Sequence, residues 1–289
     1  MNSNRKHDFN QEFFDIIDTE EKAYILGFIY ADGCNNRHPS TGELSIAQME
    51  RDIDILLKIK KAMDSTYPIF EEKNKFSEEK RFRFYVYSKR IKSQLNNLGV
   101  VHNKSLILKF PEFISDELMP HFIRGYFDGD GSVWEGKRKK MIVKKKNKPG
   151  EFRERIVHNV KFNFTGSNTF IPFLQDYLVK HLGFSRTKLN YSKAKEDHRH
   201  CSMEYSGRKN LKILYDYMYS SATIYGERKK AKFEKILCAL SEKSLSEMGL
   251  IAGKPEMAIS SQADKKEGSS TIPEMEVESS DSKCPTLSE

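Results

Sequence analysis

Two apolar runs stand out in the pattern of hydrophobic and polar positions along the chain. They occupy residues 23–33 and 122–131, and neither alternates between apolar and polar residues. The lack of alternation argues against a half-exposed strand, and a run of about nine apolar residues is too short to cross a membrane. Each run ends in Asp-Gly, and glycine is the usual residue after a helix. The pattern therefore predicts two buried helices that end at Asp32 and Asp130.

The small residues within these runs predict how the two helices meet. Gly27 and Ala31 are one helical turn apart, and Gly125 and Gly129 repeat this spacing. Small residues on one helix face let two backbones approach closely, which would bring both terminal carboxylates to the same end of the pair. Carboxylates beside the free carbonyl groups of two helix ends form a hard-oxygen site that suits Mg²⁺. The alternative is two separate buried helices with solvated Asp-Gly turns, and the repeated spacing disfavours it.

The segments after the two runs show the same order of helical and alternating patterns. In the first half, the pattern predicts a motif helix at 19–32 that starts from Asp18 and Glu21, strands at 44–47, 67–72 and 81–87, and helices at 52–63 and 89–98. In the second half, it predicts strands at 132–134, 161–164, 187–191 and 201–205, and helices at 168–181, 208–219 and 227–240. The segment 81–87 alternates, so we expect its basic and aromatic side chains on opposite faces. This order indicates an α+β protein of two pseudo-symmetric αββαββα halves, at 8–112 and 113–241.

A comparison of the two halves locates an insertion. Ile46 and Phe164 occupy matching strand positions 118 residues apart, whereas Asp32 and Asp130 are only 98 residues apart. The second half must therefore contain extra residues between its motif and its second strand, which we place at 137–156. Eight of the twelve residues from 137 to 148 are Lys or Arg, so we expect this flexible cluster to contact phosphates rather than bases.

Charge and composition indicate a polyanionic partner. The net charge is +8, and it is uneven, because residues 245–289 contribute −5 and the first 244 residues +13. The segment 245–289 is rich in Ser and acidic residues and has no aromatic residue, which predicts a disordered tail. The four cysteines have no zinc-ligand spacing, and no secretory signal or membrane helix is visible. We expect an intracellular protein, in the cytoplasm, nucleoid or an organelle, that is neither secreted nor membrane-bound.

The two motifs resemble the signature of the LAGLIDADG, or DOD-type, homing endonucleases. The matching segments are 25–33 and 123–131, with Arg124 as the least typical residue. The resemblance covers about residues 8–241 and implies a single-chain enzyme whose motif helices form the interface between its halves. It also implies two antiparallel sheets that form a saddle over duplex DNA, which is the LAGLIDADG homing endonuclease fold.

The resemblance also implies the roles of individual residues. Asp32 and Asp130 would hold Mg²⁺ (or Mn²⁺), together with the backbone carbonyls of Ala31 and Gly129. Asp128 matches a less critical acid of the family, and we expect it to cap or pack.

The family further uses one basic residue in each half to assist the attacking water or the leaving group. Lys104 lies in the typical context, and Lys229 is our choice within the segment 228–230. The alternative for both is a solvated surface lysine.

The strands are expected to read the DNA, because a two-stranded ribbon fits the major groove. The DNA-binding candidates are Arg81, Arg83, Lys161, Asn163, Lys188 and Asn190 on strands, and Lys139, Lys140 and Lys145 in the insertion. For each strand residue, an ordinary solvated sheet face is an equal alternative.

The resemblance implies a monomeric, site-specific endonuclease that makes a staggered double-strand break at a long asymmetric DNA site with a divalent metal. The chain begins with Met1 and does not end in His-Asn, so we do not expect a complete intein. One alternative is an RNA maturase that assists group I intron splicing, which would need neither acid. Others are a DNA-binding regulator that has lost cleavage and an element without remaining activity.

Overall fold

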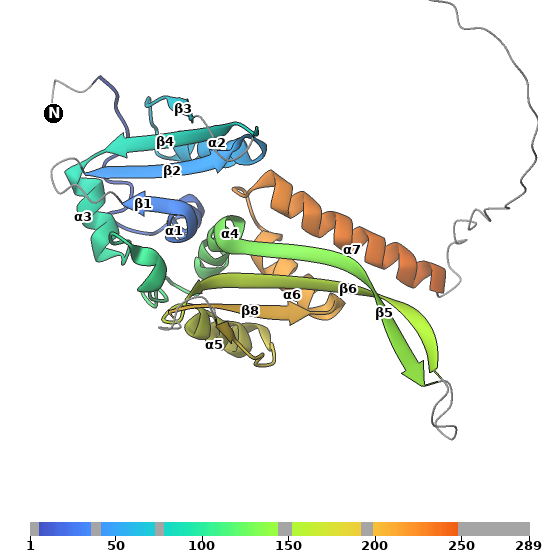
Figure 1. Cartoon of the computed structure of the whole chain (residues 1–289). Helices are drawn as coiled ribbons and strands as arrows, with labels where there is room; N and C mark the ends of the chain where they lie inside the picture. The colour runs from blue at the N-terminus through green and yellow to red at the C-terminus, as the bar shows by residue number, and fades with distance from the viewer. Residues whose placement is uncertain (1–5, 36–41, 73–77, 144–151, 192–198, 248–289) are drawn as a thin grey trace, which may run out of the picture. The chain divides into compact units, whose positions relative to one another are not determined.

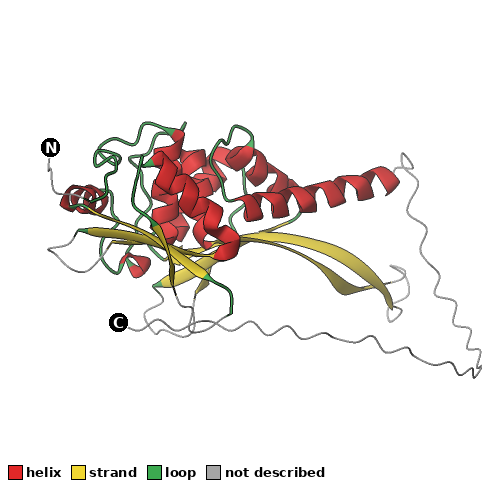
Figure 2. Cartoon of the chain, turned by 90° about the horizontal axis from the view of Figure 1, so that it is seen from above, coloured by secondary structure: helices red, strands yellow, loops and turns green. Residues whose placement is uncertain are grey.

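The computed structural model describes residues 6–35, 42–72, 78–143, 152–191 and 199–247, all within one compact unit, Met1–Ile251. Two four-stranded antiparallel sheets and the helices that cover them make up this unit (Figure 1). Figure 2 shows the helices gathered on one side of the strands. The α+β fold class and its two sheets are therefore confirmed. Within the described residues, no helix is both long and apolar enough to span a bilayer.

The first half follows the predicted order. Its elements are α1 (Glu20–Asp32), β1 (Gly33–Asn35), β2 (Glu43–Met49), η1 (Glu50–Asp52), α2 (Ile53–Ala62), β3 (Ile69–Glu72), β4 (Arg81–Tyr87), α3 (Lys89–Asn97) and η2 (Lys104–Leu106). The sheet order is β1-β2-β4-β3. The N-cap of α1 is Thr19, one residue after the predicted Asp18, because Thr19 Oγ1 accepts a hydrogen bond from the backbone N–H of Lys22. Asp18 instead accepts a hydrogen bond from the side-chain ammonium of Lys22.

The second half repeats this arrangement. Its elements are α4 (Met119–Asp130), β5 (Gly131–Val143), β6 (Phe152–Ser167), α5 (Ile171–Leu182), β7 (Asn190–Tyr191), β8 (His200–Ser206), α6 (Arg208–Tyr219) and α7 (Glu227–Glu247). The order β5-β6-β8-β7 matches that of the first sheet. Gly33 pairs with Ile46, and Gly131 pairs with Phe164 in the same relative register. The half boundaries at 112 and 241 stay predictions.

The insertion is a strand extension where a flexible loop was expected. β5 and β6 remain paired from Gly131 and Phe164 out to Val143 and Phe152. β8 pairs with β6 only at 161–167, so residues 152–160 form a two-stranded ribbon with β5 (Figure 1). Residues 137–140 therefore lie on a strand, and 144–151 fall outside the described residues. The predicted tail also falls outside them, except for 245–247, which end α7.

The two faces of β4 differ from the prediction in one respect. Phe84 and Val86 are buried in the core, as alternation requires. Tyr85 and Tyr87, however, share the opposite face with the arginines of this strand, because they occupy the same odd-numbered positions. The Tyr85 ring stacks on Phe70 from β3, with centroids 5.2 Å apart. Basic and aromatic side chains therefore alternate only over the first half of this strand.

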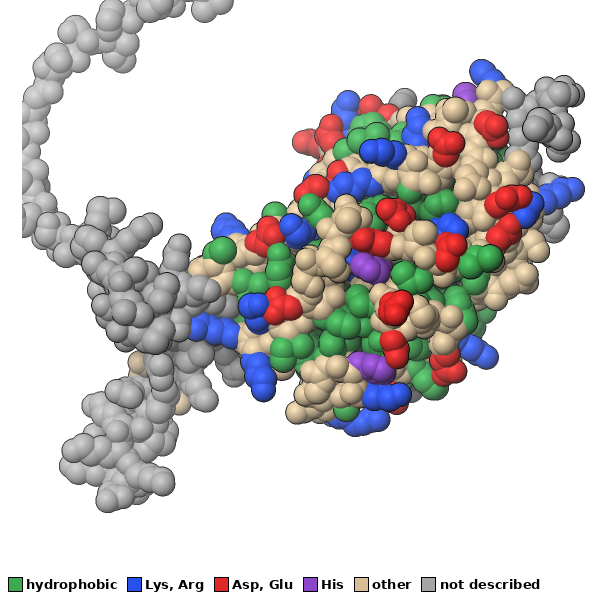
Figure 3. Space-filling model, turned by 180° about the vertical axis from the view of Figure 1, so that it is seen from behind, with side chains coloured by type: hydrophobic (Ala, Val, Ile, Leu, Met, Phe, Trp, Pro, Cys, Tyr) green, Lys and Arg blue, Asp and Glu red, His purple; other side chains and the backbone are tan. Residues whose placement is uncertain are grey.

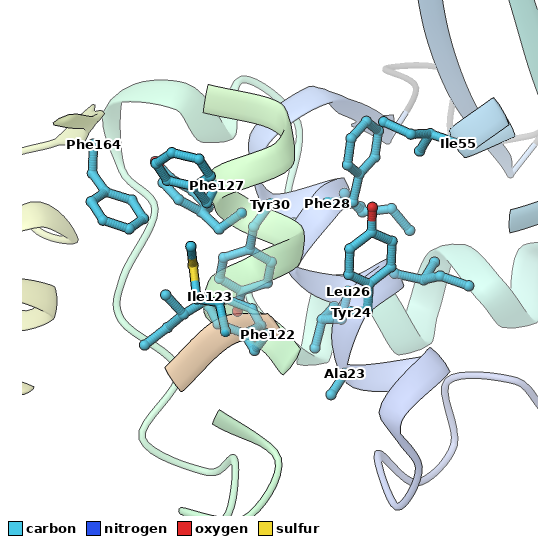
Figure 4. Close-up of a cluster of buried hydrophobic side chains, with 14 of the residues drawn as sticks. Ala23, Tyr24, Leu26, Phe28, Tyr30, Ile55, Phe122, Ile123, Phe127 and Phe164 are labelled. Carbon is cyan, nitrogen blue, oxygen red and sulfur yellow. The ribbon is translucent and has the colours of Figure 1, made fainter. Parts of the chain in front are cut away.

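Helices α1 and α4 pack directly against each other. Buried apolar side chains from both helices, such as Tyr30 and Phe122, surround the contact (Figure 4). A β-carbon on Gly27 would lie 2.0 Å from the Phe122 carbonyl oxygen, and one on Gly125 would lie 1.9 Å from the Tyr24 carbonyl oxygen. No larger residue fits at either position unless the helix backbones separate. The small-residue spacing of the sequence thus reflects a backbone-to-backbone contact between the two halves.

Candidate active site

Asp32 and Asp130 are the last residues of α1 and α4, and the chain passes from each helix directly into a strand. The glycine after each acid has an extended conformation, with φ of −74° at Gly33 and −86° at Gly131. These glycines are needed for space, since a β-carbon on Gly131 would lie 2.2 Å from the Phe127 ring. The tight exit from each helix fixes where the acid side chain begins.

The two helix ends bring the acids of both halves together. A β-carbon on Gly129 would lie 2.2 Å from that of Ala31 and 3.6 Å from the Asp32 carboxyl carbon. Asp130 keeps solvent contact, but its partial desolvation, with Asp32 nearby, raises the pKa of the Asp130 carboxyl to about 6, against the attraction of Lys104 and Lys229. Two carboxylates that disfavour each other's charge form a site that attracts a cation.

Gln48 is a neighbour of Asp32 that the sequence analysis missed. Its side-chain Nε2 donates a hydrogen bond of 2.7 Å to Asp32 Oδ2. The residue lies on β2, two positions beyond Ile46, which pairs with Gly33. No motif marks this glutamine, and only the register of β1 against β2 brings it to the acid.

Lys104 brings a charge from the first half to the helix ends. The residue is 6% exposed, and its Nζ donates 2.9 Å to the carbonyl oxygen of Ala31. Burial lowers the pKa of the Lys104 ammonium, while Asp130 and Asp32 oppose this shift. The ammonium therefore lies beside both candidate acids.

Lys229 plays the corresponding part in the second half. Its Nζ donates to the carbonyl oxygens of Phe127, Gly129 and Gly131, at 2.8, 2.8 and 2.7 Å. Burial lowers the pKa of this ammonium, chiefly against the attraction of Asp128. Its neighbours are engaged elsewhere, because Arg228 pairs with Asp52 and Lys230 with Glu234. Of the segment 228–230, Lys229 is thus the side chain that reaches the helix end.

The donor set fits a hard divalent cation. Asp32 and Asp130 supply carboxylates. The carbonyl oxygens of Ala31 and Gly129 each accept a hydrogen bond from a lysine ammonium, so both oxygens already face positive charge. A carbonyl oxygen has two lone pairs and can serve a second cationic partner. In the described part of the chain, no group of three or more His, Cys, Asp or Glu side chains is placed to hold a metal ion.

Asp128 lies at the helix interface and not beside these acids. Its carboxylate is buried and accepts hydrogen bonds from Tyr24 Oη at 2.8 Å, Tyr219 Oη at 3.1 Å and the Gly226 N–H at 2.7 Å. Burial raises the pKa of this carboxyl, and the three donors oppose that shift. The side chain is fully engaged in packing the second half against α1.

Several predicted DNA-binding residues have acidic partners that the sequence analysis missed. Arg83 donates to Glu72 at 2.5 Å, Lys161 to Glu204 at 2.6 Å, and Lys139 pairs with Glu154 at 2.8 Å. Asn163 accepts from Ser132 Oγ at 2.8 Å. Arg81 also pairs with Glu72, at 3.7 Å, whereas Lys188 and Asn190 are exposed. Lys140 is the strand partner of Arg155, and Lys145 falls outside the described residues.

Arg81, Arg83, Lys161 and Asn163 lie on sheet faces that point away from the core, because the residues that alternate with them include the buried Phe84, Phe162 and Phe164. A hollow of about 570 Å³ on the second sheet is lined by Lys161, Asn163 and Glu204, beside Trp134, which is 48% exposed. On the side turned away from the view of Figure 1, acidic and basic side chains are interspersed (Figure 3). No motif in the sequence marks Trp134 as part of this surface.

Comparisons with known proteins give matches of low sequence identity. No family model matches the chain. It is 32% identical over 114 residues to the DNA-directed RNA polymerase subunit Rpo1C of Methanocaldococcus jannaschii, a match that covers 38% of this chain and 12% of that protein. The chain therefore spans about an eighth of the length of this relative.

Solved structures match over most of the chain. The I-LtrWI LAGLIDADG homing endonuclease bound to target DNA is 16% identical, with 82% of this chain and 93% of that chain covered and a TM-score of 0.47. The LAGLIDADG meganuclease I-AabMI bound to uncleaved DNA is 14% identical, with 78% and 92% covered and a TM-score of 0.48. The LAGLIDADG meganuclease I-CpaMI bound to uncleaved DNA is 12% identical, with 81% of this chain and 96% of that chain covered and a TM-score of 0.48. The chain is thus similar to proteins of the same LAGLIDADG family that its two motifs resemble.

Proposed function

We propose that this chain is a site-specific DNA endonuclease of the LAGLIDADG homing type that hydrolyses both strands of its target with a divalent metal. The observation that carries the proposal is the meeting of two helix-terminal aspartates, with the buried Lys104 and the half-buried Lys229 on the adjoining carbonyls. A purely structural helix pair has no need of four charged groups at one end, because charges that lose solvent cost free energy.

The chemistry follows from the charges around a phosphate. Mg²⁺ or Mn²⁺ at Asp32 and Asp130 would neutralise charge on the phosphate and lower the pKa of a water molecule. Asp32 is oriented by Gln48, and Lys104 and Lys229 place positive charge where the scissile phosphate would carry negative charge. The lysine ammonium groups also donate hydrogen bonds to the carbonyl oxygens at the helix ends, which keeps those oxygens oriented when substrate is absent.

The sheets supply the DNA-binding surface in this proposal. Side chains on the faces away from the core, such as Arg81 and Lys161, are long enough to reach base edges from strands in the major groove. The ribbon at 135–143 and 152–160 has no counterpart among the described residues of the first half. A single chain with unequal halves suits a long asymmetric site, read by a monomer.

Cleavage of a randomised duplex library tests the proposal and identifies the target. We expect double-strand cuts at one long site in Mg²⁺ and none in EDTA. Retention of a duplex without cutting would instead indicate a DNA-binding regulator. Preferential retention of an intron RNA without cutting of any duplex would indicate an RNA maturase, and either result would overturn the endonuclease proposal.

A further inference from the structure

The segments that carry Lys104 and Lys229 both lie against the opposite half of the molecule. Lys229 belongs to α7, the last helix of the second half, and Lys104 belongs to η2, which follows α3 in the first half. Each Nζ donates to a carbonyl oxygen at the C-terminal end of the helix of its own half, α1 for Lys104 and α4 for Lys229. The chain around each lysine, however, is held by side chains of the other half.

The start of α7 is anchored to the first half by a bidentate ion pair. Arg228 donates to Asp52 from Nε at 2.7 Å and from Nη2 at 2.9 Å, so both carboxylate oxygens are used. Asp52 is buried and is the last residue of η1, which follows β2 directly. A planar guanidinium on a carboxylate fixes direction as well as distance. Because Arg228 precedes Lys229 in the chain, this ion pair fixes the place where the lysine side chain leaves the helix.

Two side chains of α2 add to this anchor. Asp54 Oδ2 accepts a hydrogen bond of 3.1 Å from the Glu227 backbone N–H, one of the N–H groups that a helix leaves free in its first turn. Lys58 donates to the Tyr225 carbonyl oxygen at 2.6 Å and to Glu227 Oε1 at 2.7 Å. The helix that carries Lys229 therefore receives part of its N-terminal capping from the first half.

The segment of Lys104 is anchored to the second half in a corresponding way. The Leu108 N–H donates to the Lys104 carbonyl oxygen at 2.9 Å, which closes a turn between the two residues. The Leu108 carbonyl oxygen in turn accepts from Ser167 Oγ at 2.5 Å and from Thr169 Oγ1 at 2.7 Å. Ser167 is buried and ends β6, as Met49 ends β2, at the offset of 118 residues that relates the two halves. In both halves, the residues at or just after the end of the second strand thus hold the lysine segment of the other half.

We propose that Asp52 is a positioning residue for Lys229, and that Ser167 and Thr169 are positioning residues for Lys104. The inference rests on the proposed endonuclease function, which gives the two lysines their chemical role. Each lysine then reaches the helix end of its own half only when the opposite half holds its backbone. Neither half contains all the residues that place its own lysine.

Single-turnover cleavage at saturating target DNA tests the contact with Asp52. Asp52→Asn keeps the size of the side chain and removes its charge. We expect the cleavage rate to fall about 10- to 100-fold, the effect of a small displacement of a group at the reacting phosphate. The affinity for DNA in EDTA should not change, because neither partner of the pair is placed on a sheet face that contacts DNA.

Two further variants separate positioning from a general loss of stability. Arg228→Gln should slow cleavage as Asp52→Asn does, and the double variant should be no slower than either single one, because all of them remove the same contact. Glu234→Gln is the control, since Glu234 pairs with Lys230 on the same helix and not with the first half, and it should cut normally. An unchanged rate for Asp52→Asn, or fully additive losses in the double variant, would overturn the inference.

Lysine NMR tests both anchors without DNA or metal. In protein with ¹⁵N-labelled lysine, Lys104→Met and Lys229→Met assign the two ammonium signals. Asp52→Asn should shift the Lys229 signal and speed its proton exchange with solvent, and leave the Lys104 signal unchanged. Ser167→Ala with Thr169→Val should have the opposite pattern.

The two signals also distinguish failure of this inference from failure of the proposed function. Absence of either shift, or a shift of the lysine that belongs to the same half as the substitution, would overturn the inference. If wild type cuts no DNA while both shifts occur in the opposite half, the endonuclease proposal fails and the positioning contacts stand.

Discussion

The paired helices α1 and α4 carry charged groups at both of their ends, and the two ends treat those charges differently. At the N-terminal end, Arg124 is completely buried, and Glu20 is its ion-pair partner at 2.7 Å. At the C-terminal end, Asp32 and Asp130 are both exposed and lie beside lysine ammonium groups. The same pair of helices therefore has one closed end and one open end.

At the closed end, nearly every polar group is used. Arg124 also donates from Nε to the Ile224 carbonyl at 2.8 Å and from Nη1 to the Met218 carbonyl at 2.6 Å. Glu20 accepts the Thr223 N–H at 2.7 Å in return. This network fixes the segment between α6 and α7, and so supports the helix that carries Lys229.

At the open end, the charges have few partners of their own. Asp32 has one side-chain donor, Gln48, and the lysines bind to backbone carbonyls and not to the acids. In this helix pair, the charged groups at the N-terminal end serve stability, and those at the C-terminal end remain available for chemistry. Satisfied buried charges hold the halves together, and unsatisfied ones are left for a substrate or cation.

A β-carbon at the helix contact should disrupt both ends at once, with the largest effect of all. In Gly125→Ala, the new atom would lie 1.9 Å from a backbone oxygen, so the helices must separate. We expect the free energy of unfolding to fall by about 3 kcal/mol or more in urea titrations followed by circular dichroism. Ser93→Ala, at an exposed position of α3, is the control. A loss as small as that of the control would contradict the backbone contact.

Removal of the buried arginine should be nearly as costly and specific to the closed end. Arg124→Met leaves Glu20 without its charged partner and two carbonyl oxygens without their donor, and we expect the unfolding free energy to fall by about 3 kcal/mol. Arg90→Met is the matched control, because that arginine pairs with Asp15 at an exposed site and its loss should lower the unfolding free energy far less. Similar losses for the two variants would remove the distinction between a closed and an open end.

The lysines at the open end should contribute less to stability, and unequally. Lys229→Met removes three hydrogen bonds to carbonyls and should cost about 2 kcal/mol, whereas Lys104→Met removes one and should cost about 1 kcal/mol. Thermal or urea unfolding measures both, and Lys232→Met, on the exposed side of α7, should cost under about 0.5 kcal/mol. The reverse order would show that Lys104 has the stronger structural role.

The smallest effect is a pH dependence. The pKa of Asp130 is raised to about 6 in the folded chain from 3.8, so the folded state binds the proton more tightly and the ionised form is destabilising. Wild type should therefore lose stability relative to Asp130→Asn as pH rises through about 6. Since the carboxyl keeps solvent contact, the difference at pH 7.5 should be only about 0.5–1 kcal/mol in EDTA. An unchanged difference between pH 4 and pH 7.5 would contradict it.

The sequence predicts the parts of the site that depend on the spacing of residues within one helix. Gly27 and Gly125 mark the helix contact, and Asp32 and Asp130 follow at fixed distances along the same helices. The order of helices and strands along the chain also follows, because the halves repeat with a measurable offset. The ribbon itself was expected as a loop, since a run of lysines has no periodicity that distinguishes the two.

The parts that escape prediction depend on register between distant elements. Gln48 reaches Asp32 only through the pairing of β1 with β2, and Glu204 neutralises Lys161 only through the pairing of β6 with β8. Arg124 is visible in the sequence as an atypical motif residue, but its acidic partner lies 104 positions away. Contacts of this kind are absent from any single-segment pattern, so the sequence offers no signal for them.

Cleavage of the isolated target by single acid variants is the most direct test of the central claim. Wild type, Asp32→Asn, Asp130→Asn and the surface control Asp216→Asn would be compared in Mg²⁺, with DNA affinity measured separately in EDTA. The account predicts that both motif variants bind the target at least as tightly as wild type and make no double-strand cut, while Asp216→Asn cuts normally. Undiminished cutting by Asp32→Asn or Asp130→Asn would contradict it, and the open end of the helix pair would then have no catalytic role.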